Sequence, residues 1–146
     1  MSSFSGFLPT VQALVQCYQA FEACSDSHIR TLGLTPPQFD IVATLGNTPG
    51  MTSKALSEKT LITKGTLTGV IDRLVERGWV ERAAHDRDRR CQTVRLTPAG
   101  EAVFARVFPA HMEHMATHFA GVAEADHKRW QGALHALRDQ LKKEKT

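Results

Sequence analysis

The chain has 146 residues, enough to bury the core of one domain of ordinary size, and its net charge of only +3 does not by itself indicate a polyanionic partner. No apolar run approaches the roughly 20 residues that cross a bilayer, and the N-terminus lacks the basic-then-apolar order of a secretory signal, so we expect a cytosolic protein with no membrane partner. The three cysteines show no CxxC and no zinc-finger spacing, which argues against a disulfide framework.

The basic charge is concentrated in the middle of the chain. Residues 51–100 contain ten Lys/Arg and six Asp/Glu, a local net charge of +4 that exceeds the charge of the whole chain. A local basic surface of this kind is more typical of a nucleic-acid footprint than of a generic enzyme.

The N-terminal third predicts two helices. Apolar residues recur at helical spacing over about residues 8–30, which predicts a first amphipathic helix that Gly33 ends. The run Thr35-Pro36-Pro37-Gln38 combines an N-cap, prolines in the first turn and a glutamine three residues after the cap. This run predicts the start of a second helix.

The next segment predicts a helix-turn-helix. Thr52 caps a helix that reaches about Lys59, and Thr63 caps a longer one that Gly78 ends. The predicted inner face of the longer helix is apolar and comprises Leu67, Val70, Ile71, Leu74 and Val75.

The exposed start of this longer helix is small, hydroxylic or cationic, and comprises Lys64, Gly65, Thr66, Thr68 and Gly69. Such a helix can approach a duplex closely, while its hydroxyls, its ammonium group and its backbone N–H groups meet phosphates or base edges. An ordinary solvated helix start is the alternative.

A strand pair follows the predicted helix-turn-helix. Residues 79–82 and 93–96 alternate as strands and predict an antiparallel hairpin whose long tip carries the charged run. Arginines on such a tip can reach the narrow minor groove, which attracts guanidinium groups, and the neighbouring aspartates can hold their geometry. A solvated turn is again the alternative. Thr97-Pro98 then starts a long helix, and apolar residues over 130–141 give a last helical stripe.

Three segments resemble one known family. Residues 88–100, DRRCQTVRLTPAG, resemble the DxRxxxxxLTxxG signature of the MarR family of transcription regulators. Residues 74–82, LVERGWVER, are similar to the run that precedes this signature in the family, and residues 32–39, LGLTPPQF, resemble the start of its second helix. The resemblance extends over about residues 10–141.

The resemblance implies a mainly α fold with a small β-hairpin wing, a winged helix-turn-helix with N- and C-terminal dimerisation helices. It implies a single domain over residues 1–146, with the DNA-binding part at about 35–98 and dimerisation helices at about 8–30 and 98–142. Residues 63–73 would form the recognition helix. Arg90 would be the wing arginine in the minor groove and Asp88 would steady it, while Arg87 and Arg89 would meet phosphates. The full set of expected DNA contacts is Ser53, Lys54, Thr63, Lys64, Gly65, Thr66, Thr68, Arg73, Arg87, Asp88, Arg89 and Arg90.

Dimerisation is also expected from the residues themselves. The predicted first and last helices carry apolar stripes that a winged domain of roughly 70 residues cannot cover alone, and an uncovered stripe is a partner site. The alternative is that these helices pack only on their own chain.

The family resemblance implies release from DNA by a small aromatic or phenolic effector. The site would lie where the dimerisation helices meet the winged domain, and its candidate residues are Tyr18, Phe39, Phe108, His111 and Met112. A plain core role is the alternative for each of them.

Metal and thiol sensing are two further alternatives. His111, His114 and His118 share one helix face and could bind a divalent metal ion, but Val107 and Asp40 stand where zinc-responsive relatives are expected to have ligands. We therefore expect three solvated histidines and no cofactor. Cys91 follows Arg89 and Arg90, which could stabilise a thiolate, although a plain strand residue is the simpler interpretation.

The leading hypothesis is a ligand-responsive, sequence-specific repressor that binds a pseudo-palindromic operator as a homodimer. A metal- or thiol-responsive regulator of the same fold, and a winged-helix protein-interaction module that never meets DNA, are the alternatives. An enzyme is not expected, because the chain has no HExxH, no Gly-rich phosphate loop after a strand and no nucleophile elbow.

Overall fold

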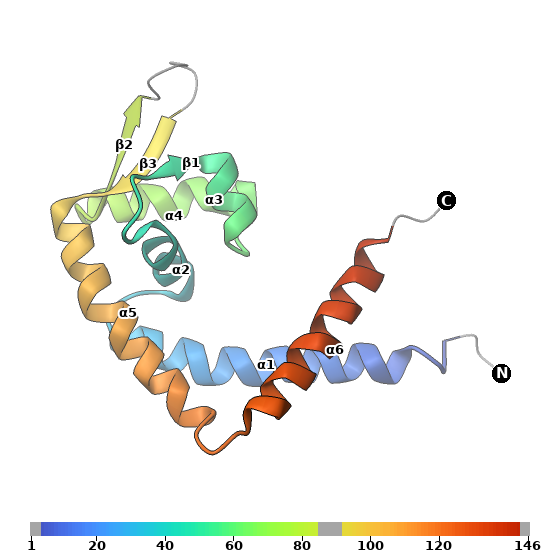
Figure 1. Ribbon diagram of the computed structural model, residues 1–146. Helices are drawn as coiled ribbons and strands as arrows, with labels where there is room; N and C mark the ends of the chain where they lie inside the picture. Colours follow the sequence, from blue (N-terminus) through green and yellow to red (C-terminus); the bar gives the residue numbers. More distant parts are fainter. Residues whose placement is uncertain (1–3, 85–91, 144–146) are drawn as a thin grey trace. The chain divides into compact units, whose positions relative to one another are not determined.

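A computed structural model describes residues 4–84 and 92–143 (Figure 1). Within these ranges the chain forms six helices and three short strands. In chain order they are α1 Leu8–Thr31, α2 Pro36–Leu45, β1 Met51–Thr52, α3 Ser53–Lys59, α4 Lys64–Glu76, β2 Val80–Ala84, β3 Gln92–Leu96, α5 Pro98–His118 and α6 Glu124–Lys142. The chain divides into two compact units, with the boundary between Met115 and Ala116.

The corner between α1 and α2 forms as its sequence predicts. Gly33 adopts a left-handed φ of 87°, which ends α1 without the steric cost that a β-carbon would bring. The Thr35 hydroxyl accepts a hydrogen bond from the Gln38 backbone N–H at 3.3 Å, and the Gln38 amide oxygen accepts one from the Thr35 N–H at 3.2 Å. This reciprocal capping box fixes the start of α2.

The three strands form an antiparallel sheet in the order β1-β3-β2 (Figure 1). The predicted hairpin is confirmed, with β2 and β3 in register from Val80 opposite Leu96 to Ala84 opposite Gln92. The two-residue β1 pairs with the other edge of β3 and was not predicted, because so short a segment has no alternation to detect. The expected wing-tip contacts Arg87, Asp88, Arg89 and Arg90, and Cys91, lie outside the described residues.

The hydrophobic core of the first unit lies between α2, α4 and the sheet. Ile41, Leu45, Leu74 and Val94 have no exposed side-chain area, and the inward residues of α4 are those that the sequence predicts. Val75 is the exception: its side chain is 38% exposed, because it follows Leu74 by 100° around the helix and faces away from the core.

A glycine at the start of α5 is explained by a close backbone contact. A β-carbon at Gly100 would lie 1.9 Å from the carbonyl oxygen of Trp79, which precedes β2. The Thr97 hydroxyl donates to the Gly78 carbonyl at 2.6 Å and accepts from the Gly100 N–H at 3.0 Å. The last glycine of the LTxxG run is therefore the residue that lets α5 begin directly against the base of the wing.

Two helices carry apolar side chains that their own unit does not cover. Along α1, Val11, Val15, Tyr18 and Phe21 are each between 41% and 49% exposed. In the second unit no residue of α6 is buried, and its exposed apolar side chains are Trp130, Leu134 and Leu141. Among the described residues, no helix has both the length and the apolar character needed to span a membrane.

Candidate nucleic-acid interface and the cavity beside it

The turn between α3 and α4 is held by side-chain hydroxyls. The Thr60 hydroxyl donates to the Leu56 carbonyl at 2.8 Å and accepts from the Ile62 N–H at 3.4 Å. The Ser57 hydroxyl donates to the Ile62 carbonyl at 3.2 Å. In a tight turn, backbone N–H and C=O groups lack helical partners, and these side-chain hydroxyls take the place of those partners. They fix where α4 starts relative to α3.

The predicted contact surface at the start of α4 is exposed as a whole. Thr63 occupies the N-cap position, but its hydroxyl contacts the Thr66 hydroxyl at 3.3 Å and does not cap a backbone N–H. The N-terminal N–H groups of α4 thus receive no side-chain cap from Thr63, and the exposed set on this surface is Ser53, Lys54, Thr63, Lys64, Gly65, Thr66, Thr68 and Gly69. A helix start without a side-chain cap and with a positive dipole end favours a bound anion.

Two glycines on this surface have no packing role inside the chain. A β-carbon added at Gly65 or Gly69 would meet nothing within 4 Å. Glycine in a helix interior costs roughly 0.5–1 kcal/mol relative to alanine. No contact within the described chain explains why glycine stands at these two positions. A partner that approaches the α4 backbone closely would explain it.

The arginines at the base of the hairpin are already paired. Arg82 donates to Asp72 at 2.6 Å, and Arg95 donates to Glu81 across the sheet at 2.7 Å. These two residues were not among the expected DNA contacts. Arg73 was, and its exposed side chain also lines the cavity described next.

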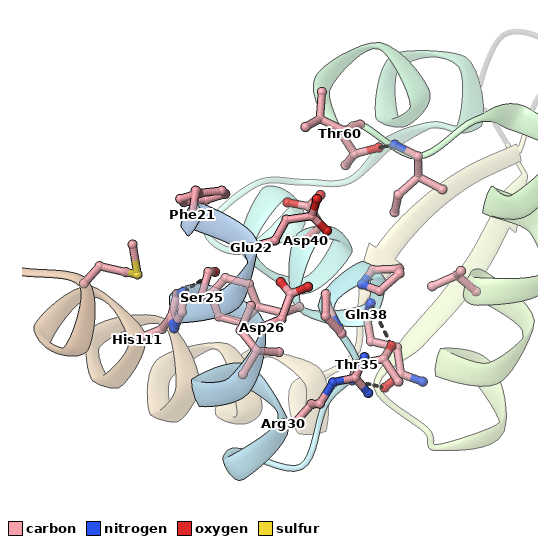
Figure 2. Close-up of a pocket in the computed structure, with 18 of the residues that line it drawn as sticks. Phe21, Glu22, Ser25, Asp26, Arg30, Thr35, Gln38, Asp40, Thr60 and His111 are labelled. Atoms are coloured by element: carbon pink, nitrogen blue, oxygen red, sulfur yellow. Dashed lines mark hydrogen bonds between the residues drawn. The ribbon is translucent and has the colours of Figure 1, made fainter. Parts of the chain in front are cut away.

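A cavity of about 930 Å³ lies between α1, α2, the α3–α4 turn, α4 and α5 (Figure 2). Of the five expected effector residues, Tyr18, Phe39, His111 and Met112 line it. Phe108 does not: its ring packs on Phe104 at 5.2 Å between centroids, against the core, so this expectation is wrong. Phe108 lies nearly three turns into α5, and the sequence alone does not show which neighbouring elements that side of the helix meets.

The cavity wall also carries charged side chains that sequence reasoning missed. Glu22, Asp26 and Asp40 are acidic, and Arg30, Lys59 and Arg73 are basic. Burial raises the pKa of Asp40 above its ordinary value, and a hydrogen bond from the Leu61 backbone N–H opposes that rise. The wall therefore offers both signs of charge next to aromatic rings.

Three histidines lie close together beside the cavity, and one of them, His111, lines it. His111 of α5 is buried, its Nδ1 lies 2.9 Å from Nδ1 of His28 on α1, and its Nε2 lies 3.1 Å from the Ser25 hydroxyl. The ring of His114 stacks on that of His28 at 4.1 Å. Solvated histidines were expected on this face, and for His111 this is wrong; only His118 of the three is exposed. The signal that was missed is His28, which is 83 residues away in sequence from its partner.

The hydrogen bonds restrict where protons can sit in this cluster. The Cys24 carbonyl lies 3.2 Å from Nε2 of His114, and because a carbonyl only accepts, that nitrogen donates. Between the two Nδ1 atoms of His28 and His111 there is room for one proton, since two N–H groups would face each other. Desolvation by burial, followed by the charge of His114, lowers the pKa of His28; for His111, burial comes first, then the charges of His28 and His114, and Asp26 opposes these effects.

These lowered pKa values predict acid-sensitive folding. Below pH 6.5 the unfolded chain binds protons at His28 and His111, whereas the folded chain keeps these imidazoles neutral to a lower pH. The contribution of both groups to the free energy of unfolding is therefore present above pH 6.5 and is lost as the pH falls through the folded pKa values. We expect the Tm to fall by roughly 3 °C or more between about pH 7.5 and pH 5.5. Differential scanning calorimetry of wild type and His28→Gln measures this, and the variant should lose part of the slope.

His135→Gln, on the exposed surface of α6, is the matched control and should keep the wild-type slope. If His28→Gln shows the same pH dependence as wild type, the histidine cluster is not the cause of it.

The metal alternative finds no support in the described part of the chain. No group of three or more His, Cys, Asp or Glu side chains within residues 4–84 and 92–143 is placed to hold a metal ion. The nitrogen atoms of His28 and His111 point at each other, and His114 points at a carbonyl. Cys17 and Cys24 are free thiols, and the thiol candidate Cys91 lies outside the described residues.

Comparison with known proteins gives consistent matches. The sequence model of the MarR family matches residues 32–90. The multiple antibiotic resistance protein MarR of Salmonella typhimurium is 27% identical over 100 residues, which cover 68% of this chain and 69% of that protein.

Two solved structures extend these matches over most of the chain. A probable transcriptional regulator from Pseudomonas aeruginosa is 30% identical with a TM-score of 0.71, covering 86% of this chain and 93% of that one. BpsR of Bordetella bronchiseptica, whose DNA binding is regulated by 6-hydroxynicotinic acid, is 25% identical with a TM-score of 0.77, covering 89% and 98%.

Proposed function

Because the chain belongs to the MarR family of transcription regulators, we propose that it is a sequence-specific, ligand-responsive repressor. It binds a pseudo-palindromic operator as a homodimer, and a small aromatic or phenolic effector releases it. It is not an enzyme, and its work is done by binding alone. The observation that carries the DNA-binding part is the exposed, glycine- and threonine-rich start of α4.

The start of α4 has the chemistry of a surface that reads a duplex. Thr63, Lys64, Thr66 and Thr68 present hydroxyls and an ammonium group, and the N-terminal N–H groups of α4 add a positive dipole end. The bare backbone at Gly65 and Gly69 allows closer approach than any other residue would. Paired arginines at the base of the wing leave the tip residues Arg87, Arg89 and Arg90 as the proposed wing contacts.

The uncovered apolar faces support a second copy as partner. Val11, Val15 and Tyr18 on α1, and Trp130 and Leu134 on α6, are each between 41% and 52% exposed, and exposed apolar faces of this kind mark interaction sites. Closed two-fold symmetry buries the same patch on both chains, and it presents two recognition helices to two half-sites.

The cavity supports the effector part of the proposal. Its volume fits a small aromatic molecule, and Tyr18 and Phe39 supply aromatic walls. Val70 and Arg73 of α4 belong to the same wall, so an occupant contacts the recognition helix directly. The similarity to BpsR points in the same direction.

Selection of bound duplexes from a random pool tests this proposal. The expected product is a short inverted repeat whose half-site centres lie about one helical turn, 10–10.5 base pairs, or a multiple of it, apart. Sedimentation of the complex should show two chains per site. A pool that shows no enrichment would leave the interaction-module alternative standing.

Replacing the proposed wing arginine tests the hairpin separately. Arg90→Ala should weaken binding to the selected duplex by about 1–3 kcal/mol, because a guanidinium in a groove is lost. Fluorescence anisotropy measures the Kd of this variant and of Arg138→Ala on α6, the control, whose side chain only pairs with neighbouring Asp139 on the surface. Equal affinities of Arg90→Ala and wild type would remove Arg90 from the interface.

A further inference from the structure

One short segment, residues 77–79, joins the end of α4 to the α1–α2 corner. One guanidinium nitrogen of Arg77, Nη1, donates to the Gly33 carbonyl at 2.9 Å and to the Gln38 amide oxygen at 3.2 Å. The same guanidinium lies 3.7 Å above the ring of Trp79, which leads into the first wing strand. Arg77 itself is the C-cap of α4. One side chain therefore contacts the corner and the wing from the end of the predicted recognition helix.

The backbone of the same segment holds the start of α5. The Gly78 carbonyl accepts from the Thr97 hydroxyl at 2.6 Å, and the Trp79 carbonyl accepts from the Thr97 N–H at 3.0 Å. The backbones of Gly100 and Trp79 are so close that a β-carbon at Gly100 would lie 1.9 Å from the Trp79 carbonyl oxygen. A shift of residues 77–79 is consequently a shift of the wing base and of the first turn of α5.

The corner that Arg77 contacts is also a wall of the cavity. Thr35 and Gln38 both line it, and Figure 2 shows their reciprocal hydrogen bonds there. The Gln38 amide oxygen accepts from the Thr35 N–H and from Arg77, each at 3.2 Å. An occupant of the cavity that displaces this amide must therefore disturb two hydrogen bonds at once, the one within the capping box of α2 and the one from Arg77.

We infer that Arg77 is a positioning residue that sets the placement of α4 and the wing from the α1–α2 corner, and so transmits the state of the cavity to the DNA-reading surface. This inference rests on the proposed function and deepens it. Arg77 acts through Gly33, Gln38 and Trp79, and it makes no contact with DNA.

A second, direct route competes with this one. Val70 and Arg73 belong to α4 and line the cavity themselves, so an occupant can also push the helix without Arg77. The two routes predict different behaviour when the Arg77 contacts are removed, and this difference decides between them.

The first measurement separates positioning from DNA contact and from folding. Arg77→Met removes the charge and both hydrogen bonds, and Arg106→Met, at an exposed site on α5, removes the same charge elsewhere. We expect Arg77→Met to raise the Kd for the selected duplex about tenfold, with an unchanged salt slope and an unchanged active fraction. Arg106→Met should leave the Kd within about twofold of wild type.

A fall of about one in the magnitude of the salt slope would make Arg77 a phosphate contact and overturn the inference. A lower active fraction with an unchanged Kd would reduce Arg77 to a purely structural role. Arg77→Lys keeps the charge but loses the planar guanidinium that lies over the Trp79 ring, so an intermediate Kd is expected. This variant also serves if Arg77→Met does not fold.

The second measurement tests transmission from the cavity without an added ligand. Met112 lines the cavity from α5, and Met112→Trp fills part of it with an aromatic group. In the wild-type background this change should weaken duplex binding about fivefold or more. In the Arg77→Met background it should change the Kd less than about twofold, and in the Arg106→Met background the full effect should return.

Equal effects of Met112→Trp with and without Arg77 would show that the direct route carries the signal, and no effect in wild type would show that the cavity is not coupled to DNA binding at all. Either result overturns the inference while DNA binding stands. Absence of duplex binding by wild type would instead overturn the proposed function, and the inference with it.

Discussion

Gly100→Ala is expected to lower the free energy of unfolding by about 3 kcal/mol or more, a large effect for the addition of one methyl group. The new β-carbon would lie 1.9 Å from the Trp79 carbonyl oxygen, less than any real contact allows, and that oxygen belongs to backbone that cannot rotate away. Relief requires α5 to move off the wing base, which breaks the bond from Thr97 N–H to the Trp79 carbonyl. Urea unfolding followed by circular dichroism measures the change.

Gly132→Ala provides the matched control. Gly132 lies inside α6, and a β-carbon there would meet nothing within 4 Å, so alanine should stabilise the chain by up to about 1 kcal/mol. The two substitutions are chemically identical and should have opposite signs. A change smaller than about 1 kcal/mol at Gly100 would show that the start of α5 is not locked against Trp79.

Val15→Asp is expected to convert the proposed homodimer into a monomer and to weaken operator binding by about a hundredfold or more. Val15 lies within the exposed apolar face of α1 and is 47% exposed in the single chain. In an isologous interface a carboxylate at this position is buried once in each chain, so its desolvation cost is incurred twice. Analytical ultracentrifugation gives the oligomeric state, and titration of the selected duplex gives the affinity.

Gln16→Asp controls for the added charge, because Gln16 lies on the opposite, polar side of α1 and is also exposed. This variant should remain dimeric. If Val15→Asp is dimeric too, the face of α1 that contains Val11 and Val15 is not the interface between copies.

The elements of the fold could be predicted because their signals are local. The capping box at Thr35 and Gln38 and the alternation in the hairpin act over a few residues, and the structure confirms each of them. The strand β1 was not predicted, because its two residues are held by pairing with Val94 and Thr93, which are remote in sequence. The exposure of the start of α4 was predicted from its composition, since small, hydroxylic and cationic side chains need no internal partner.

The cavity was predicted only in part, because its wall is built by tertiary contacts. Tyr18 and Phe39 were expected there from the family resemblance and do line the cavity, whereas the ring of Phe108 packs on Phe104 against the core. His111 was expected in solvent because its partner His28 is on another helix. The reach of Arg77 to Gly33 spans 44 residues and has no sequence signal at all.

We propose that this chain binds duplex DNA through a basic surface formed by α4 and the wing. Titration of the Kd for the selected duplex from about 50 to about 200 mM salt tests it most directly, because phosphate contacts release counterions. The predicted result is a linear fall of log K with log salt, with a slope magnitude of several and a much weaker affinity for a scrambled duplex. No binding to either duplex at the lowest salt would show that this surface does not bind DNA.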